Sequence, residues 1–205
     1  MVIYSFFNGK PWEKNSFAKE VAEYISLKYP ELEIDNKNIK YDFKEMNYIA
    51  TLKTTQEIKF HVKDYNGSLE DDYYVSIWNT KVSNELTSLI RKKDKEGSAR
   101  YFIEGISNDE MKKYKDYSLH SELSHEIQTH SKIFIYFSND FSGSSHQLQN
   151  CYEIIEEVKE KKREANIVFF FRKSPMIVIN IDQLDKVKDR KDIENFIVDI
   201  DSILK

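Results

Sequence analysis

Histidine and glutamate residues gather in one segment of the sequence and could bind a metal ion. Three of the five histidines lie between His120 and His130, with Glu122 and His125 in the same stretch. A zinc-protease helix carries two histidines four residues apart, so that both imidazoles lie on one helix face. Here His125 and His130 are five residues apart, which separates them by about 140° around a helix. The two imidazoles therefore cannot hold one ion from a regular helix.

Glu122 and His125 are three residues apart, and they could still supply two ligands if other parts of the fold supplied more. A metal-dependent hydrolase is the function that such a site would support. The apolar positions of the segment recur at every fourth place: Leu119, Leu123 and Ile127. Relative to that stripe, a helix places His130 near the buried face and His125 opposite it. The interpretation that we favour is a solvated helix with one buried histidine, without a metal ion or other cofactor.

Two other places invite comparison with phosphate-binding or catalytic arrangements. The loop from Ser138 to Ser145 joins a predicted strand to a predicted helix, the position from which glycine-rich loops bind phosphate. It holds one glycine and no following Lys-Ser/Thr pair, so a surface loop with a serine cap is the better interpretation. His146 and Cys151 are five residues apart, but Cys151 shares an apolar helical stripe with Leu148, which predicts a buried and inert thiol.

The aromatic run Tyr73–Trp78 is the candidate contact surface. As a strand, it turns alternate side chains to opposite faces, so that one set enters the core while Tyr74 or Trp78 stays at the surface. Rigid amphipathic rings make good contact residues. The adjacent Asp71 and Asp72 would point to opposite faces and could not share a proton. We therefore predict no catalytic residue, and we take Tyr74 and Trp78 as candidate contact aromatics.

Periodicity predicts the elements that position these residues. Asn15 or Ser16 caps a helix that Pro30 ends. Its apolar stripe comprises Phe17, Val21, Tyr24 and Ile25. Four strands are predicted next: Leu32–Ile34, Tyr48–Leu52, Glu57–Val62 and Tyr73–Trp78. In the third strand, Phe60 faces the core and His61 faces solvent. A helix with Val82, Leu86, Leu89 and Ile90 and a strand at Tyr101–Ile103 follow.

The second half predicts a strand-helix-strand-strand-helix series. A helical stretch from Asp109 to about His130 comes first. The predicted strands of the series are Ile133–Phe137, Ile167–Phe171 and Met176–Ile181, and its predicted helices are Leu148–Val158 and Ile193–Leu204. The two late strands are joined by a short turn and should pair antiparallel, whereas the strand before the helix is open to a parallel pairing. The triple Phe169–Phe171 favours a strand buried on both faces.

The predicted fold class is therefore α+β, with helices packed on mainly antiparallel sheets. We expect a membrane-proximal stub at 1–12, an N-terminal helix-then-strands unit at 13–108 and a C-terminal unit at 109–205. One continuous core is the alternative, because no linker separates the halves. We interpret residues 1–12 as membrane-proximal because Val2–Phe7 is apolar but too short to cross a bilayer.

Composition excludes several function classes. Lys and Arg number 31 against 35 Asp and Glu, which leaves a net charge of -4 with both signs interleaved. The sequence shows no cluster of basic residues that would form a positively charged face, so a nucleic acid is a poor candidate partner. The one cysteine, Cys151, rules out a disulfide framework and every multi-cysteine metal site. No uninterrupted apolar stretch reaches the roughly 20 residues that span a membrane.

Several segments together suggest a family. They are Phe7–Trp12, Lys19–Tyr24, Lys28–Glu31, Ile58–Val62 and Asp72–Tyr74 before Trp78. In these segments the chain resembles small membrane-anchored or lipid-anchored proteins of uncharacterised function from Bacillus-like Gram-positive bacteria. The resemblance covers roughly the first 95 residues best. It implies an anchor upstream of Val2, an extracytoplasmic globular part and no known enzymatic activity.

The leading hypothesis is a noncatalytic extracytoplasmic binding or structural module, tethered at the membrane surface. Its partner would be a protein or a component of the cell envelope, bound through an exposed sheet face or an aromatic rim. Two alternatives stay open: a metal-dependent hydrolase built on the His120–His130 segment, and a cytosolic phage or immunity-type module that binds another protein.

Overall fold

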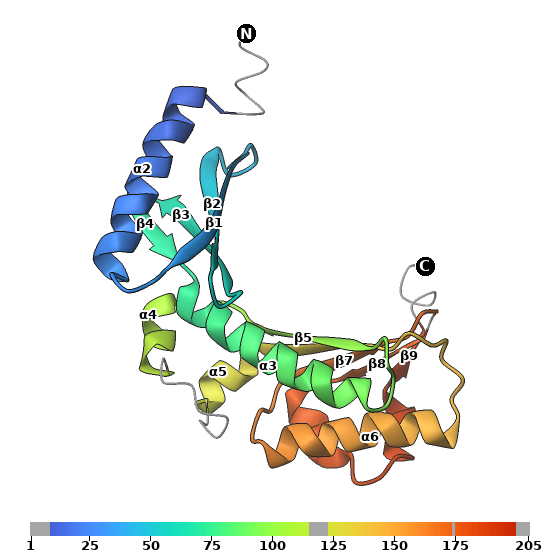
Figure 1. Cartoon of the computed structure of the whole chain (residues 1–205). Coiled ribbons are helices and arrows are strands. Elements are labelled where there is room, and N and C mark those ends of the chain that lie inside the picture. Colours follow the sequence, from blue (N-terminus) through green and yellow to red (C-terminus); the bar gives the residue numbers. More distant parts are fainter. Residues whose placement is uncertain (1–8, 115–122, 174, 200–205) are drawn as a thin grey trace. The chain divides into compact units, whose positions relative to one another are not determined.

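The computed structural model describes residues 9–114, 123–173 and 175–199 (Figure 1). It confirms the α+β class, because helices accompany two sheets whose strand pairs are mainly antiparallel. Two compact units are present. Unit 1 comprises the chain up to Ile77 together with Ser107–Asp109, and unit 2 comprises Trp78–Ile106 and the chain from Glu110 onward. The division therefore lies inside a helix, before the boundary expected near residue 109.

Unit 1 is a helix packed on a four-stranded antiparallel sheet. The helix α2 (Pro11–Lys28) buries Phe17, Val21 and Ile25, as their spacing predicts. It begins at Pro11 and not after a cap at Asn15 or Ser16, because proline is suited to the first helical position. The strands follow one another in the order β1 (Ile34–Asp42), β2 (Asn47–Thr54), β3 (Lys59–Tyr65) and β4 (Ser68–Asp71).

The alternation predicted for β3 is confirmed. Phe60 and Val62 are fully buried, and His61 between them is exposed. The predicted short strand Leu32–Ile34 is wrong in extent, since β1 only begins at Ile34 and buries Ile39 alone. A polar edge strand of this kind leaves little hydrophobic pattern in the sequence.

The chain enters α2 through a tight approach between Gly9 and Tyr48. Gly9 has a φ of +69°, and a Cβ atom at this position would collide with the phenol of Tyr48. The Tyr48 hydroxyl donates a hydrogen bond to the Lys10 carbonyl oxygen at 2.8 Å. Position 9 therefore needs glycine both for its backbone conformation and for space.

The strand expected at Tyr73–Trp78 is wrong. Those residues form the beginning of α3 (Tyr73–Arg91), which continues through the helix expected around Val82 and Leu86. Val75, Trp78, Val82, Leu86 and Ile90 are its buried apolar residues. Their spacing of three or four residues is that of one helical face, and it extends the stripe of the later part of the helix.

Unit 2 is built on a five-stranded sheet in the order β5 (Ser98–Ile103), β6 (Ser131–Tyr136), β7 (Asn166–Phe170), β8 (Met176–Ile179) and β9 (Ile197–Val198). The β7–β8 pair is antiparallel and the β6–β7 pair is parallel. Helix α6 (Ser145–Glu160) connects β6 to β7, and Ser144 caps it by accepting from the Gln147 N–H. The serine cap is thus confirmed.

The expected closing helix Ile193–Leu204 is wrong in its described part. Asp192–Phe196 forms a 3-10 turn (η3) and the chain then enters β9. Residues 200–205 lie outside the described part. The expected helix from Asp109 to His130 is also wrong in form. The described pieces there are α4 (Asn108–Met111), the 3-10 turn η1 (Lys112–Tyr114) and α5 (His125–Thr129).

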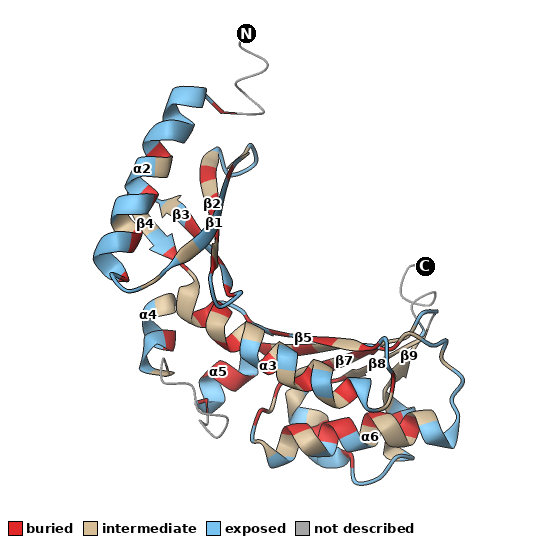
Figure 2. Ribbon diagram, in the orientation of Figure 1, coloured by how far each residue is buried: buried red, intermediate tan, exposed pale blue. Residues whose placement is uncertain are grey.

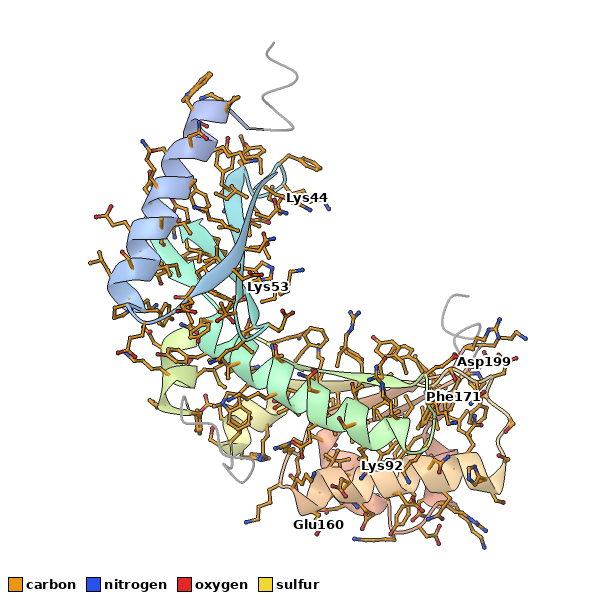
Figure 3. The ribbon with its side chains drawn as sticks, viewed as in Figure 1. Lys44, Lys53, Lys92, Glu160, Phe171 and Asp199 are labelled. Atoms are coloured by element: carbon orange, nitrogen blue, oxygen red, sulfur yellow. The ribbon has the colours of Figure 1, made fainter. Side chains whose placement is uncertain are left out.

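The core of unit 2 lies on one face of this sheet, against α6. Alternate strand residues such as Ile133, Ile167 and Phe169 are fully buried, and so are Cys151 and Ile155 of α6. Figure 2 shows the buried stretches of α6 and of the sheet in red. Polar helix and loop residues such as Lys92 and Glu160 point outward (Figure 3). The expectation that Phe169–Phe171 is buried on both faces is wrong, since Phe170 and Phe171 are only half-buried.

Helix α3 also covers the outer edge of the five-stranded sheet. Side chains at every fourth position accept hydrogen bonds from alternate backbone N–H groups of β5: Asn79 from Ile103 at 3.1 Å, Ser83 from Tyr101 at 2.8 Å and Thr87 from Ala99 at 2.9 Å. An exposed strand edge is a template for unwanted pairing. Polar side chains from the helix occupy these donors instead.

Within the described residues, no helix is both long enough and apolar enough to cross a membrane.

Candidate functional site

The residues considered for a metal site do not form one in the described part of the chain. Glu122 lies outside the described residues, as does His120. His125 begins α5 and is exposed. His130 is exposed as well, so its expected place near the buried face is wrong. In residues 9–114, 123–173 and 175–199, no three His, Cys, Asp or Glu side chains are placed to hold one ion.

The two candidate contact aromatics also change place because α3 is a helix. Trp78 is 1% exposed, so its expected position at the surface is wrong. Its indole N–H donates to the Tyr114 carbonyl oxygen at 3.2 Å. Tyr74 is half-buried, and its ring lies 5.8 Å from that of Tyr29. Neither side chain is a free surface anchor, and Tyr74 belongs to a polar cluster that the sequence did not reveal.

That cluster centres on Asp71, whose side chain is completely buried at the end of β4. One carboxylate oxygen accepts from the Tyr29 hydroxyl, the Asn108 amide and the Tyr73 backbone N–H, each at 2.9 Å. The other accepts from the Tyr24 hydroxyl at 2.6 Å and the Lys28 ammonium at 2.9 Å. A buried carboxylate is stable only when its oxygens are satisfied in this way.

The groups around Asp71 hold their protons firmly. Burial and the hydrogen bond to Asp71 raise the pKa of Tyr24 to about 12. Burial and the negative charge of Asp71 also raise the pKa of Tyr29. Burial alone would lower the pKa of Lys28, but its hydrogen bonds to Tyr24 and Asp71 outweigh it and raise the pKa. None of the three is poised to exchange a proton near neutral pH, so the cluster is suited to fastening α2 and not to acid–base catalysis.

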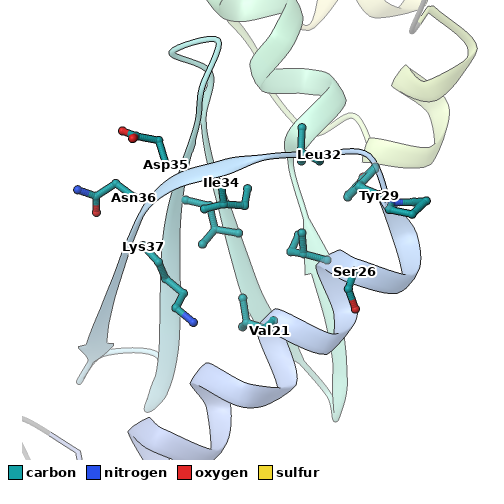
Figure 4. Close-up of a pocket in the computed structure, with 12 residues that line it drawn as sticks. Val21, Ser26, Tyr29, Leu32, Ile34, Asp35, Asn36 and Lys37 are labelled. Atoms are coloured by element: carbon teal, nitrogen blue, oxygen red, sulfur yellow. The ribbon is translucent and has the colours of Figure 1, made fainter.

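A pocket of about 470 Å³ opens beside this cluster, between α2 and the beginning of β1 (Figure 4). Its lining is mixed, and its apolar part includes the buried side chains of Val21, Ile25 and Leu52. Its polar lining residues are Ser26, Tyr29, Asp35, Asn36 and Lys37. The volume falls within the range of small-molecule sites, which combine apolar walls with polar groups.

Two features border the pocket. The Lys37 ammonium donates to the Ala18 carbonyl oxygen of α2 at 3.3 Å, so it links the strand to the helix. A second pocket, of about 340 Å³, is lined by Tyr29, Leu32 and Tyr73. Tyr29 therefore lines both pockets while its hydroxyl is held by Asp71.

His61 and Asp72 form a second, exposed pair in unit 1. The Asp72 carboxylate lies 3.2 Å from His61 Nδ1 and also accepts from the His61 backbone N–H at 2.6 Å. The hydrogen bond to Asp72 raises the pKa of His61 against the lowering effect of burial. The expectation that Asp71 and Asp72 point apart is confirmed, since Asp71 is buried and Asp72 reaches this exposed histidine.

Two titratable side chains of unit 2, Glu85 and Cys151, have structural roles. Burial alone would raise the pKa of Glu85, but hydrogen bonds from Lys161 and Arg163 outweigh it and lower that pKa. Burial raises the pKa of the Cys151 thiol to about 12. A thiol that stays protonated at neutral pH is a poor nucleophile, so the predicted inert role of Cys151 agrees with its position.

One comparison with known proteins bears on unit 1. Residues 1–73 match the family model of the YfjL-like N-terminal domain. The match ends at Tyr73, where α3 begins, so the YfjL-like segment includes α2 and all four strands of the first sheet. It also includes every residue that lines the 470 Å³ pocket. No curated protein and no solved structure matches the chain significantly.

The sequence alone did not reveal the Asp71 cluster or the pocket. Asp71 is separated by 47 residues from Tyr24 and by 37 from Asn108, so no local spacing links them. The pocket joins α2 to a strand whose beginning was misplaced. The available signal was Asp71 itself, an acidic residue at the end of a strand whose other residues are exposed or half-buried.

Proposed function

We propose that the chain is a noncatalytic binding module whose unit 1 takes an apolar group into the pocket between α2 and β1. The observation that carries this proposal is the chemistry of the pocket. Buried aliphatic side chains form its walls, and its charged groups, Asp35 and Lys37, belong to the strand at one side. Burial of an apolar group there gains about 25 cal/mol for each Å² removed from water.

The neighbouring polar residues support binding over catalysis. Both oxygens of Asp71 are occupied by donors within the unit, and the raised pKa of Tyr24 keeps its hydroxyl protonated. A general acid or base needs a pKa near the working pH and access to substrate. The cluster instead fixes α2 relative to β4, which keeps the wall of the pocket in place. The apolar group would come from a protein or from a component of the cell envelope.

Methyl NMR with 1-hexanol as the probe tests this proposal. Hexanol is neutral, apolar and small enough for the pocket. We expect saturable shifts of the Val21, Ile34 and Leu52 methyl signals, with a dissociation constant on the order of 1 mM, as suits so small a ligand. Methyl signals from the buried core of unit 2, such as those of Ile133 and Ile167, give the reference for nonspecific solvent effects.

Two matched variants make the test specific. Ala22 is exposed and lines the pocket, so Ala22→Trp should close the entrance without disturbing the core, and the saturable shifts should disappear. Glu23 is the adjacent exposed residue and does not line the pocket, so Glu23→Trp should leave them unchanged. Shifts of equal size in both variants, or no saturable shift in the original chain, would refute the proposal.

We also propose an extracytoplasmic, membrane-tethered location for this module. Its support is the apolar segment Val2–Phe7 in the sequence and the resemblance of the first 95 residues to anchored proteins. Protease treatment of intact native cells tests the location: an extracytoplasmic module is cleaved while a cytosolic marker protein survives. Protection of the module together with that marker would favour the cytosolic alternative.

A further inference from the structure

The five-stranded sheet of unit 2 carries a row of aromatic rings on the face that α6 does not cover. We call this the aromatic face, formed by Phe102, Phe134, Tyr136 and Phe170. Neighbouring rings are in contact across the strands: Phe102 and Phe134 have centroids 5.7 Å apart, Phe134 and Phe170 6.0 Å, and Tyr136 and Phe170 5.1 Å with near-parallel planes. The rings thus form one continuous surface over β5, β6 and β7.

This face is open to solvent in the described structure. Phe102 is 37% exposed and Tyr136 36%, and they are the two large exposed apolar side chains of unit 2 among the described residues. Their strand neighbours on the opposite face are buried: Ile103 is 7% exposed and Ile135 is 0% exposed. The sheet is therefore buried on one face alone, with the row Val168 and Val178 extending the open face across β7 and β8.

The sheet of unit 2 is mixed, because β6–β7 is its one parallel pair among the described strands. Sheets made only of parallel strands have both faces covered, whereas antiparallel sheets commonly leave one face to solvent. Helix α6 lies on one face of this sheet (Figure 1). A helix laid on the aromatic face would add a third layer.

A positive charge on the aromatic face indicates that its partner carries a carboxylate. Arg100 is exposed on β5, directly opposite Phe134 of β6. Among the described residues no carboxylate forms an ion pair with Arg100, whereas the nearby Lys132 is neutralised by Glu104 at 2.6 Å. A planar guanidinium beside aromatic rings is the group that recognises carboxylates at protein interfaces. The face therefore offers one positive charge within an apolar surface.

We propose that the aromatic face binds an amphipathic helix of another protein, whose apolar stripe covers the four rings and whose Asp or Glu side chain pairs with Arg100. A single-stranded nucleic acid fits less well, because it requires several cations along its phosphates and the chain has a net charge of -4. A second copy of the chain fits less well too, because it brings a second Arg100 and its Glu104 is already paired.

A display library of 18-residue amphipathic helices tests this proposal. Each peptide has a fixed leucine stripe, and the positions beside the stripe vary among Glu, Gln and Lys. On the full chain, we expect at least a tenfold enrichment of peptides with Glu at one of these positions. On Arg100→Glu, the preference should reverse toward Lys, since the charge that selects the carboxylate is inverted.

Matched variants distinguish binding at the aromatic face from nonspecific hydrophobic binding. Lys95 is exposed in the loop before β5, outside the strands that carry the rings, so Lys95→Glu should keep the preference for Glu. Phe102→Ser and Tyr136→Ser change side chains that are already exposed, and they should abolish enrichment while circular dichroism stays the same. The hexanol shifts of unit 1 report on a different site and should persist in these variants.

The proposal fails if Arg100→Glu selects the same peptides as the original chain, or if the ring variants enrich them equally. It also fails if the original chain binds a dT20 oligonucleotide while enriching no peptide. A dimer in analytical ultracentrifugation that Tyr136→Ser dissociates would assign the face to a second copy instead.

Discussion

The hydroxyl of Thr87 and the backbone of Ala99 are joined in both directions. Thr87 Oγ1 accepts from the Ala99 N–H at 2.9 Å and donates to the Ala99 carbonyl oxygen at 3.2 Å. One side chain thus satisfies both outward-facing backbone groups of an edge residue that is 5% exposed. Within unit 2, the edge of the sheet depends on helix side chains for hydrogen bonds that a further strand would otherwise supply.

Replacing Thr87 with valine tests this dependence. Thr87→Val keeps the shape but leaves the Ala99 N–H and carbonyl without their partner, so the free energy of unfolding should fall by about 1–3 kcal/mol. Urea denaturation followed by circular dichroism measures it. Thr87→Ser should restore most of the loss. The control Ser88→Ala removes an exposed hydroxyl that donates to the Asn84 carbonyl oxygen, and we expect a change within about 0.5 kcal/mol. Equal effects at both positions would contradict the edge-covering role.

Asp71 should be the most sensitive carboxylate of unit 1. Asp71→Asn keeps the size of the side chain but removes the charge that pairs with Lys28 and accepts from Tyr24 and Tyr29. We expect a loss of roughly 3 kcal/mol in the free energy of unfolding, since the partners are left with unmatched donors. Glu70→Gln changes the exposed neighbour on the same strand and should cost less than about 0.5 kcal/mol. If the two variants unfold at the same urea concentration, the cluster does not fasten α2.

The His61–Asp72 pair predicts a titration that NMR can follow. The bond to Asp72 raises the pKa of His61, so Asp72→Asn should move the midpoint of the His61 ring signals to lower pH. A raised folded-state pKa stabilises the fold below the unfolded value of about 6.5, and that contribution is lost as pH rises through the folded pKa. Both side chains are about half exposed, so the effect on the denaturation midpoint should be small. An unchanged midpoint in Asp72→Asn would show that the pair does not form in solution.

The Cys151 thiol should not react with thiol reagents in the folded chain. It is fully buried in α6, and burial raises its pKa to about 12. We expect no reaction with a colorimetric disulfide reagent at pH 8 over an hour, and one thiol per chain after unfolding in guanidinium chloride. Rapid labelling of the folded chain would mean that α6 opens readily, and hydrogen exchange of its backbone amides would then be fast as well.

Elements with a strong local period could be predicted from the sequence. The buried face of α2, the alternation around His61 and the inert position of Cys151 all follow from the spacing of apolar residues. β1 could not be, because a nine-residue edge strand with Ile39 as its one buried side chain has almost no apolar period. The strand predicted at Tyr73–Trp78 was wrong because a short run with five aromatic or aliphatic residues among six fits a strand and a helix alike.

The candidate sites could not be predicted, for a different physical reason. Asp71 looks like any acidic residue near a turn until Tyr24, Lys28 and Asn108 are brought to it from distant parts of the sequence. The aromatic face has the same origin. Phe102, Phe134 and Phe170 each appear as ordinary strand residues, and only the order and register of β5, β6 and β7 place their rings side by side.

The close approach of Gly9 and Tyr48 constrains how this chain can vary. A methyl group at position 9 meets the tyrosine ring, and a smaller residue at position 48 gives up the bond to the Lys10 carbonyl oxygen. Among homologous sequences, substitutions at these two sites should therefore be inherited together, although 38 positions separate them in the sequence.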